Sequence, residues 1–250
     1  MIGKLQLLCF VLLALACALA AETPAQAARQ FTTANQPKLT QEFSEFLSIP
    51  NVAADPANLK RNADTLVEML KKRNVEARLL SILGAPPVVY GEITVPGARH
   101  TIVFYAHYDG QPVTASEWEG GSPFTPVIRE VDGEPRIYAR SAGDDKAAIF
   151  AQLTALAALQ AARIPLRANI RFVWEGEEEA GSPHLEQILD ANRDLCTGTS
   201  GWYATARWIR AGNRLLFSGR EATRTLKSRS TVHIMACTAV ITGIGLPIPR

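Results

Sequence analysis

The chain has 250 residues, of which 47% are hydrophobic and 20% are charged, so it contains enough apolar residues for a core in one or two domains. This composition excludes a chain without a folded core. The formal net charge of +2 hides an asymmetry, because residues 198–250 contain eight Lys or Arg and one Asp or Glu, and the chain before them is acidic. Such an abrupt shift in charge indicates a boundary near residue 197.

Residues 1–21 have the pattern of a secretory signal peptide. Lys4 precedes an apolar run that is too short to span a membrane comfortably, and the small-x-small sequence Ala18-Leu19-Ala20 precedes a polar stretch. The chain is therefore expected to be exported, to the periplasm or the medium. Lipoprotein anchoring at Cys17 is the second interpretation, since Leu15-Ala16 fits that signal poorly.

Removal of this leader leaves two cysteines, Cys196 and Cys237. Export permits a disulfide bond between them, but two cysteines do not make a disulfide framework. The composition thus excludes a small disulfide scaffold, and the fold must depend on its hydrophobic core.

Helical and strand patterns alternate from residue 38 to residue 196, after a polar lead-in over residues 22–37 that has no hydrophobic period and is expected to be mobile. The helices are predicted at residues 39–47, 59–70, 144–162 and 182–192, and the strands at residues 77–83, 87–93, 101–109, 136–140 and 168–174. A Gly- and Pro-rich loop covers residues 110–126. This alternation predicts an α/β fold, a layered sheet of mainly parallel strands flanked by helices, followed by an irregular Arg-rich tail at residues 197–250.

Three polar clusters follow the predicted strands, at the edge where open α/β sheets bind ligands. His107 and Asp109 lie two residues apart on an extended chain, so both side chains point to the same side, and the imidazole can bind a metal that the carboxylate tunes. Asp144 and Asp145 open a predicted helix, which is one acid more than capping requires. Taken alone, each cluster has an ordinary alternative: a half-buried histidine beside a turn, a capped helix or a solvated acidic face.

The third cluster places Glu175, Glu177, Glu178 and Glu179 at the end of an apolar run. Ionised carboxylates at the end of a buried strand repel one another and lose solvation, and both effects cost free energy. A bound divalent cation offsets this cost. Glu178 and Glu179 can then have different roles: one binds the cation, and the other accepts a proton from water. Glu177 is expected to be a solvated bystander and Glu175 a supporting residue.

One histidine and several acids from three strand ends, without cysteine, suit Zn²⁺, with Mn²⁺ or Co²⁺ as further possibilities. An acidic calcium-binding module is the alternative, and it gives His107 no role. The motifs AHYDGQP, RSAGDDKAA and EGEEEAGS, in this order, resemble those of the co-catalytic zinc exopeptidases, a family of aminoacylases, carnosinase-like dipeptidases, desuccinylases and glutamate carboxypeptidases. The resemblance covers about residues 39–195 and is strongest to the dipeptidase branch.

The resemblance implies a partial metallopeptidase catalytic domain that hydrolyses small peptides or N-acyl amino acids with water activated by two zinc ions. It implies that His107 binds one zinc, that Glu179 binds the other and that Asp144 bridges both. It further implies that Glu178 is the general base and that Asp109 orients His107. Neither nucleic acid nor, after removal of the leader, a membrane is expected as a partner.

The resemblance stops near Cys196. The further acidic ligand, the inserted lid domain and the second histidine ligand of the family are not readable in residues 197–250. Half-filled coordination weakens metal binding, so a catalytically inactive remnant is the alternative function. A homodimer of the family type is not expected without the lid.

The genetic code offers an explanation for this Arg-rich tail. When codons are rebuilt from the last base of one residue and the first two bases of the next, parts of residues 202–249 can read as family-like strings, one of which is CDGP. We hypothesise a single frame slip between about Leu195 and Gly201. The other interpretation is an authentic basic extension that binds anions or nucleic acid.

The coding DNA tests this hypothesis directly. We expect the shifted frame downstream of Leu195 to encode these strings, with the acidic residue of CDGP a few positions after the slip. A DNA sequence whose shifted frame encodes unrelated residues or early stop codons there would eliminate the frame slip and leave the basic extension.

Overall fold

The computed structural model describes residues 23–118 and 121–196 and the backbone of four short strands beyond them. The expected signal peptide, Cys237 and most of the Arg-rich tail lie outside the described residues. The helices are α2 (Pro24–Ala34), α3 (Gln36–Leu47), α4 (Pro56–Lys71), α5 (Lys146–Ala161), α6 (Leu185–Ala191) and α7 (Arg193–Cys196), with the 3₁₀ turns η1 (Ala115–Glu117) and η2 (Glu178–Ala180). The strands are β1 (Glu76–Leu80), β2 (Val88–Ile93), β3 (Thr101–His107), β4 (Val127–Val131), β5 (Glu134–Tyr138), β6 (Asn169–Glu175), β7 (Ser200–Tyr203), β8 (Arg210–Ala211), β9 (Arg214–Leu215) and β10 (Phe217–Ser218).

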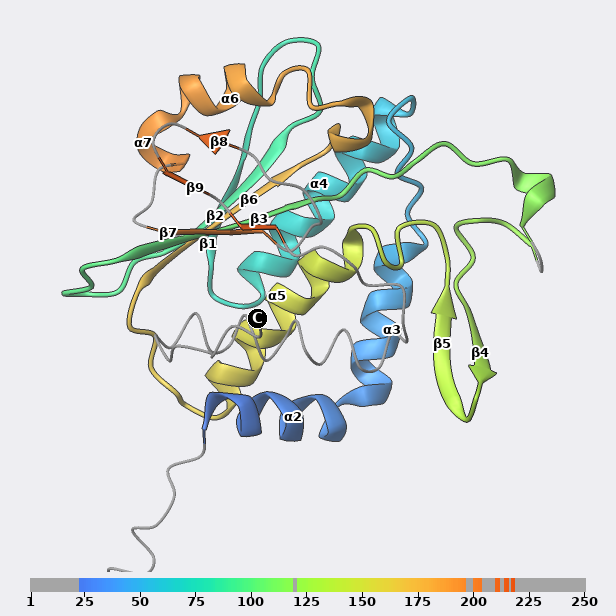
Figure 1. Ribbon diagram of the computed structural model, residues 1–250, viewed down its shortest axis with the longest axis horizontal. Helices are drawn as coiled ribbons and strands as arrows, with labels where there is room; N and C mark the ends of the chain where they lie inside the picture. The colour runs from blue at the N-terminus through green and yellow to red at the C-terminus, as the bar shows by residue number, and fades with distance from the viewer. Residues whose placement is uncertain are drawn as a thin grey trace, which may run out of the picture.

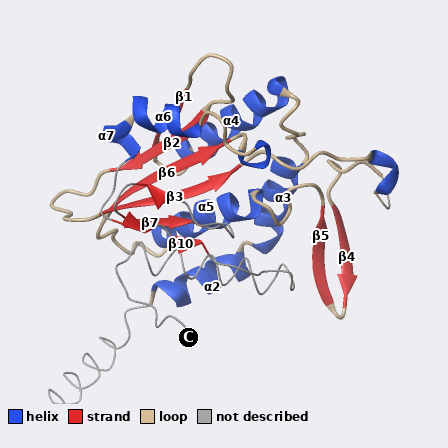
Figure 2. Cartoon of the chain, turned by 45° about the horizontal axis from the view of Figure 1, so that its top comes forward, coloured by secondary structure: helices blue, strands red, loops and turns tan. Residues whose placement is uncertain are grey.

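The main sheet has the strand order β1-β2-β6-β3-β7-β10, and helices lie on both of its faces (Figures 1 and 2). Strands β6, β3, β7 and β10 run parallel to one another, whereas β2 is antiparallel to both β1 and β6. The sheet is therefore mixed, and the predicted α/β fold of a layered sheet flanked by helices is confirmed. The backbones of β7 and β10 add to this sheet from the chain segment that was expected to be irregular.

Two hydrophobic cores pack against the two faces of the sheet. Helices α3, α4 and α5 cover one face, where Phe104, Phe172 and Trp174 belong to the larger core. Helix α6 covers the other face and contributes Leu185 and Ile188 to the smaller core. Helix α5 is buried along most of its length because α2 and α3 cover the side turned away from the sheet, which explains why its sequence is apolar all round. Among the described residues, no helix combines the length and the hydrophobicity needed to cross a bilayer.

The polar lead-in contains a helix that its sequence pattern did not predict. Helix α2 begins after Thr23, whose side chain accepts a hydrogen bond from the backbone of Gln26, while the Gln26 side chain accepts one from the Thr23 backbone. This capping box was the available signal. Ala27 and Ala28 are buried, and α2 packs against α5, so tertiary contacts stabilise a helix with a short apolar face.

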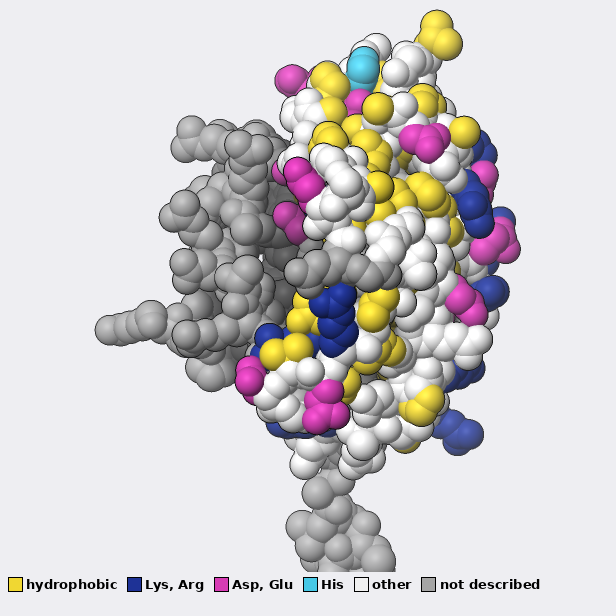
Figure 3. Space-filling model, turned by 90° about the vertical axis from the view of Figure 1, so that its right-hand side faces the viewer, with side chains coloured by type: hydrophobic (Ala, Val, Ile, Leu, Met, Phe, Trp, Pro, Cys, Tyr) yellow, Lys and Arg dark blue, Asp and Glu magenta, His cyan; other side chains and the backbone are white. Residues whose placement is uncertain are grey.

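A second difference lies between β3 and α5, where β4 and β5 form an antiparallel hairpin that projects from the body (Figure 1). Its turn is Asp132-Gly133, and both residues have positive φ, 55° and 74°, as the tight turn of a two-residue hairpin requires. The Asp-Gly pair was therefore the missed signal for β4. On the side of the molecule that carries the hairpin, acidic and basic side chains are interspersed with hydrophobic ones (Figure 3).

Candidate metal centre

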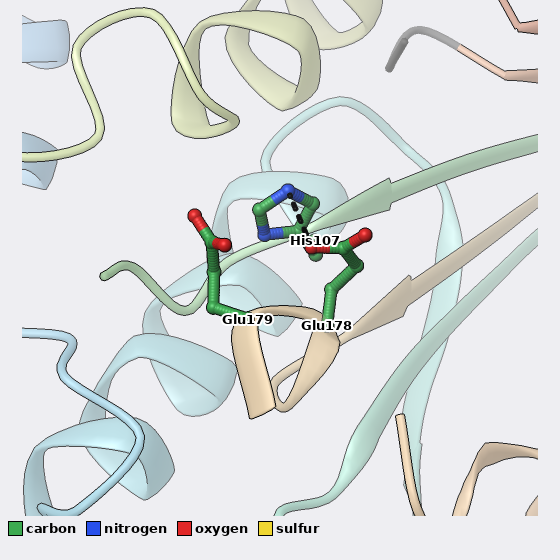
Figure 4. Close-up of side chains that lie close together, drawn as sticks. All are labelled: His107, Glu178 and Glu179. Atoms are coloured by element: carbon green, nitrogen blue, oxygen red, sulfur yellow. Dashed lines mark ion pairs between the residues drawn. The ribbon is translucent and has the colours of Figure 1, made fainter. Parts of the chain in front are cut away.

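The site forms where β3 and β6 end side by side at their carboxyl ends. His107 is the last residue of β3 and pairs in register with Glu175, the last residue of β6. The chain then turns into η2, which raises Glu178 and Glu179 on either side of the imidazole (Figure 4). One ligand atom from each of His107, Glu178 and Glu179 lies within 4.8 Å of the others. The Nε2 atom of His107 is 3.8 Å from the Oε2 atom of Glu178.

Asp144 reaches the same nitrogen from a different segment. Its Oδ1 atom lies 3.0 Å from Nε2 of His107, although His107 is 1% exposed and the Asp144 side chain is 77% exposed. The hydrogen bond to His107 lowers the pKa of Asp144, and the partial loss of solvation of its carboxylate opposes this shift less strongly. The structure thus brings carboxylates from two separate loops to one imidazole nitrogen.

Asp109 connects the histidine with the acidic turn. Its Oδ1 and Oδ2 atoms accept hydrogen bonds from the backbone N–H groups of Glu178, at 3.1 Å, and Glu179, at 2.9 Å. Its Oδ1 atom also lies 3.3 Å from Nδ1 of His107, which has no well-aligned hydrogen bond among the described residues. The fully buried carboxylate of Asp109 therefore fixes the turn that carries Glu178 and Glu179 relative to the imidazole.

The electrostatics of the site favour a cation. Burial alone lowers the pKa of His107, but the carboxylates of Asp109 and Asp144 outweigh it and raise the pKa to about 11. Burial also raises the pKa of Glu179, and its neighbours Asp144 and Glu178 add to the shift. Imidazole nitrogen with carboxylate oxygen is a donor set that zinc accepts, and the donors present fit a divalent metal ion.

Asp145 is part of the site and was not assigned a role from the sequence. The residue precedes α5, yet its side chain makes no capping hydrogen bond. Instead, its buried Oδ2 atom accepts a hydrogen bond of 3.3 Å from the backbone N–H of His107. Burial raises the pKa of Asp145 well above its usual value. Gln111, also not singled out, donates a hydrogen bond from Nε2 to Glu179.

The interpretation of Glu177 as a solvated bystander is wrong. Glu177 is buried, its Oε1 atom accepts a 2.8 Å hydrogen bond from the backbone N–H of His184, and its Oε2 atom lies 3.0 Å from Nδ1 of the same residue. Glu175 accepts hydrogen bonds from Tyr105 and from Ser182, and burial raises its pKa to about 7. The side chain of Ser182 therefore binds Glu175, and α6 has no side-chain cap.

The fold is an α/β fold, and the donor group at the ends of β3 and β6 is a candidate site for a divalent metal ion. Residues 103–211 match the model of Peptidase family M20/M25/M40, and the chain belongs to this family. The match contains all five predicted site residues and continues beyond Leu195, where the sequence resemblance was expected to stop.

The similar proteins are dipeptidases and related peptidases. The chain is 27% identical to the human Beta-Ala-His dipeptidase over 226 residues, 82% of this chain and 42% of that protein. It is 27% identical to the Cys-Gly metallodipeptidase dug1 of Schizosaccharomyces pombe, over 66% of this chain and 38% of that protein.

Two solved structures show the same fold. The human carnosine dipeptidase 1 superposes with a TM-score of 0.64 at 26% identity, over 72% of this chain and 41% of that one. The M20 family metallo-carboxypeptidase Sso-CP2 from Sulfolobus solfataricus superposes with a TM-score of 0.61 at 36% identity, over 67% and 37%. The chain spans about two fifths of the length of the curated relatives it matches, 42% of the human dipeptidase for example.

The role of Asp109 gives a test of the site. In Asp109→Asn an NH₂ group replaces one of the two acceptor oxygens, so one of the two backbone N–H donors of η2 loses its partner. We expect the dissociation constant for Zn²⁺ to rise by about 10- to 100-fold, measured by competition with a chromophoric chelator.

Asp190→Asn is the control for this substitution, because Asp190 is exposed on α6, pairs with Arg193 and does not belong to the donor group. It should bind zinc as the wild type does. Equal zinc affinity in Asp109→Asn and Asp190→Asn would contradict the role assigned to Asp109.

Proposed function

We propose that the chain is a metal-dependent hydrolase that cleaves the peptide bond of dipeptides, with His107, Asp144, Glu178 and Glu179 at its centre. The observation that carries the proposal is the convergence of these side chains on one point, with Nε2 of His107 3.0 Å from Asp144 and 3.8 Å from Glu178. Membership in the M20 peptidase family supports the same reaction class.

The proposed metal ligands are His107 and Glu179, and Asp144 is proposed to bridge two ions. When bound, zinc supplies Lewis acidity, which polarises a carbonyl group and makes water a stronger acid. Asp109 keeps the imidazole and the acidic turn in place through its three contacts. Gln111 holds the Glu179 carboxylate from the loop that follows β3.

Glu178 is the proposed general base. Its side chain is 20% exposed and lies at the edge of the donor group, where it is open to solvent and substrate more than His107 is. A carboxylate there can accept a proton from the attacking water and return it to the leaving amine. Because Glu178 also lies within the group of possible ligands, its role as base or ligand is decided by experiment.

Dipeptides are the proposed substrates because the similar proteins are named as Beta-Ala-His and Cys-Gly dipeptidases. An N-acyl amino acid presents the same bond and is the second substrate class of the proposal. The calcium-binding alternative is disfavoured by the buried imidazole at the centre of the donors, since calcium prefers oxygen ligands.

An inactive metal-binding remnant is the second candidate function. The specific observation in its favour is that the described residues bring one histidine to the donor group, whereas the resemblance implies a second histidine ligand. The two candidates differ in turnover and in how many metal ions are held tightly.

The two candidates are separated by kinetics of the full chain loaded with Zn²⁺, with β-Ala-His and Cys-Gly as substrates. If Glu178 is the base, Glu178→Gln lowers kcat by about 10²- to 10⁴-fold while zinc affinity changes little, because the amide cannot accept the proton. If Glu178 is a ligand, Glu178→Gln lowers the zinc affinity as well as kcat.

Glu186→Gln on the exposed face of α6 is the control and should keep both kcat and zinc affinity. Zinc binding without turnover in the wild-type chain would favour the remnant. Turnover that survives in Glu178→Gln would contradict the proposed mechanism.

A further inference from the structure

Asn51 lies far from the donor residues in sequence and contacts two of the segments that carry them. It follows α3, and its side chain is fully buried. Its Nδ2 atom donates a 2.7 Å hydrogen bond to the backbone carbonyl of Tyr108 and a 2.9 Å hydrogen bond to the hydroxyl of Ser141. Its own backbone carbonyl accepts a 2.9 Å hydrogen bond from the N–H of Gly110. One residue therefore makes three hydrogen bonds to two separate loops.

These contacts bracket Asp109. Tyr108 and Gly110 are its two chain neighbours, so Asn51 holds the backbone immediately before and immediately after the carboxylate that orders η2. The backbone of Asp109 cannot rotate without breaking one of the two bonds. Through Asp109, this restraint reaches the N–H groups of Glu178 and Glu179.

The third contact reaches the loop of Asp144. Ser141 is three residues before Asp144, is buried, and adopts a positive φ of 61° that side-chain-bearing residues rarely adopt. Such a conformation persists where surrounding contacts hold it. The hydrogen bond from Asn51 is one such contact. It connects the loop that carries Asp144 to the loop that carries His107 and Asp109.

The two loops also pack too closely for a larger residue between them. A Cβ atom at Gly110 would lie 2.4 Å from the hydroxyl of Ser141 and 3.2 Å from Nδ2 of Asn51. The amide of Asn51 therefore occupies a fixed place in a closely packed junction.

The backbone beside Asn51 is itself anchored to the fold. Lys146, the first residue of α5, donates hydrogen bonds from Nζ to the carbonyls of Phe46, at 2.8 Å, and Ile49, at 2.9 Å. Nδ2 of Asn62 donates a 2.7 Å hydrogen bond to the carbonyl of Pro50. These hydrogen bonds fix the backbone just before Asn51 relative to α4 and α5. The hydrogen bonds of Asn51 therefore restrain both loops relative to these helices.

A contribution to the stability of the fold does not by itself explain why an amide side chain lies at position 51. The Oδ1 atom of Asn51 is buried and has no hydrogen-bond partner among the described residues, and an unpaired buried acceptor is destabilising. The Asn51 amide nevertheless donates hydrogen bonds to both Tyr108 and Ser141, and an apolar residue of similar size cannot make either bond.

We propose that Asn51 is a positioning residue of the metal centre, a clamp that sets the distance between the loop of His107 and Asp109 and the loop of Asp144. The proposal rests on the proposed function, since the geometry that it sets is that of the metal donors. It adds a residue, outside all three acidic or histidine motifs, on which metal affinity depends.

Hydrogen exchange of the metal-free full chain, together with zinc titration, tests the clamp. We expect Asn51→Ala to accelerate amide exchange in residues 106–112 and 139–146 and to weaken zinc binding by about tenfold or more, as loss of an outer support does at other metal sites. Ser141→Ala removes only one arm, so it should accelerate exchange in residues 139–146 more than in residues 106–112.

Asn169→Ala is the matched control. Asn169 is also an amide that ties two segments, through Val95 and Thr101, but it lies at the opposite end of β3 and β6 from the donors. At a comparable loss of thermal stability, it should leave both loops and the zinc affinity unchanged. A role in stability alone predicts equal effects on zinc affinity for Asn51→Ala and Asn169→Ala.

The outcomes separate the clamp from the proposed function. Unchanged exchange in both loops of Asn51→Ala overturns the clamp, and so does opened exchange with wild-type zinc affinity. If the wild-type chain binds no zinc, the proposed function fails and the assignment of Asn51 to a metal centre fails with it. In that case, opened exchange in Asn51→Ala leaves a structural clamp between the two loops. If Asn51→Ala does not fold, Ser141→Ala decides between these outcomes with the same two readouts.

Discussion

The carboxylate of Asp109 is the interaction on which the site depends. It is fully buried, it accepts hydrogen bonds from the N–H groups of Glu178 and Glu179, and its Oδ1 atom lies 3.3 Å from Nδ1 of His107. Because these two N–H groups point at Asp109, the side chains of the same two residues are presented to the imidazole. A buried charge thus determines where two further charges lie.

The mixed sheet makes this arrangement possible. Strands β3 and β6 are parallel and in register, so His107 and Glu175 end together and the chain segments that follow them meet at one edge. The turn before α5 brings Asp144 and Asp145 to the same edge, and Asn51 is hydrogen-bonded to Ser141 in the same segment. The concentration of acidic groups there raises the pKa of His107 to about 11, the electrostatic signature of a place where a cation is stabilised.

The two strands and the polar residues that follow them could be predicted from the sequence, because both are encoded in local sequence patterns. The apolar runs of β3 and β6 and the motifs that follow them are local patterns, and topology requires that parallel strands end at one edge. His107, Asp109, Glu178 and Glu179 were predicted in this way, the resemblance to the zinc exopeptidases selected Asp144 over Asp145, and the structure brings all five together. Their individual roles as ligand, bridge and base stay proposals.

The missed features depend on contacts between distant segments. Asn51 looks like an ordinary loop residue, because its partners are at positions 108 and 141. Glu177 was taken for a surface acid, since only the fold reveals His184 beside it. Helix α2 and strand β4 had weak local signals, a capping box and an Asp-Gly turn, and both were outweighed by the polar composition around them.

The central claim is that these residues hold a divalent metal ion, and anomalous X-ray diffraction of zinc-soaked crystals at the zinc absorption edge tests it most directly. The account predicts an anomalous peak bound by Nε2 of His107 and by carboxylate oxygens from Asp144 and the η2 turn. The absence of a peak there, or a peak only at surface histidines, would contradict it.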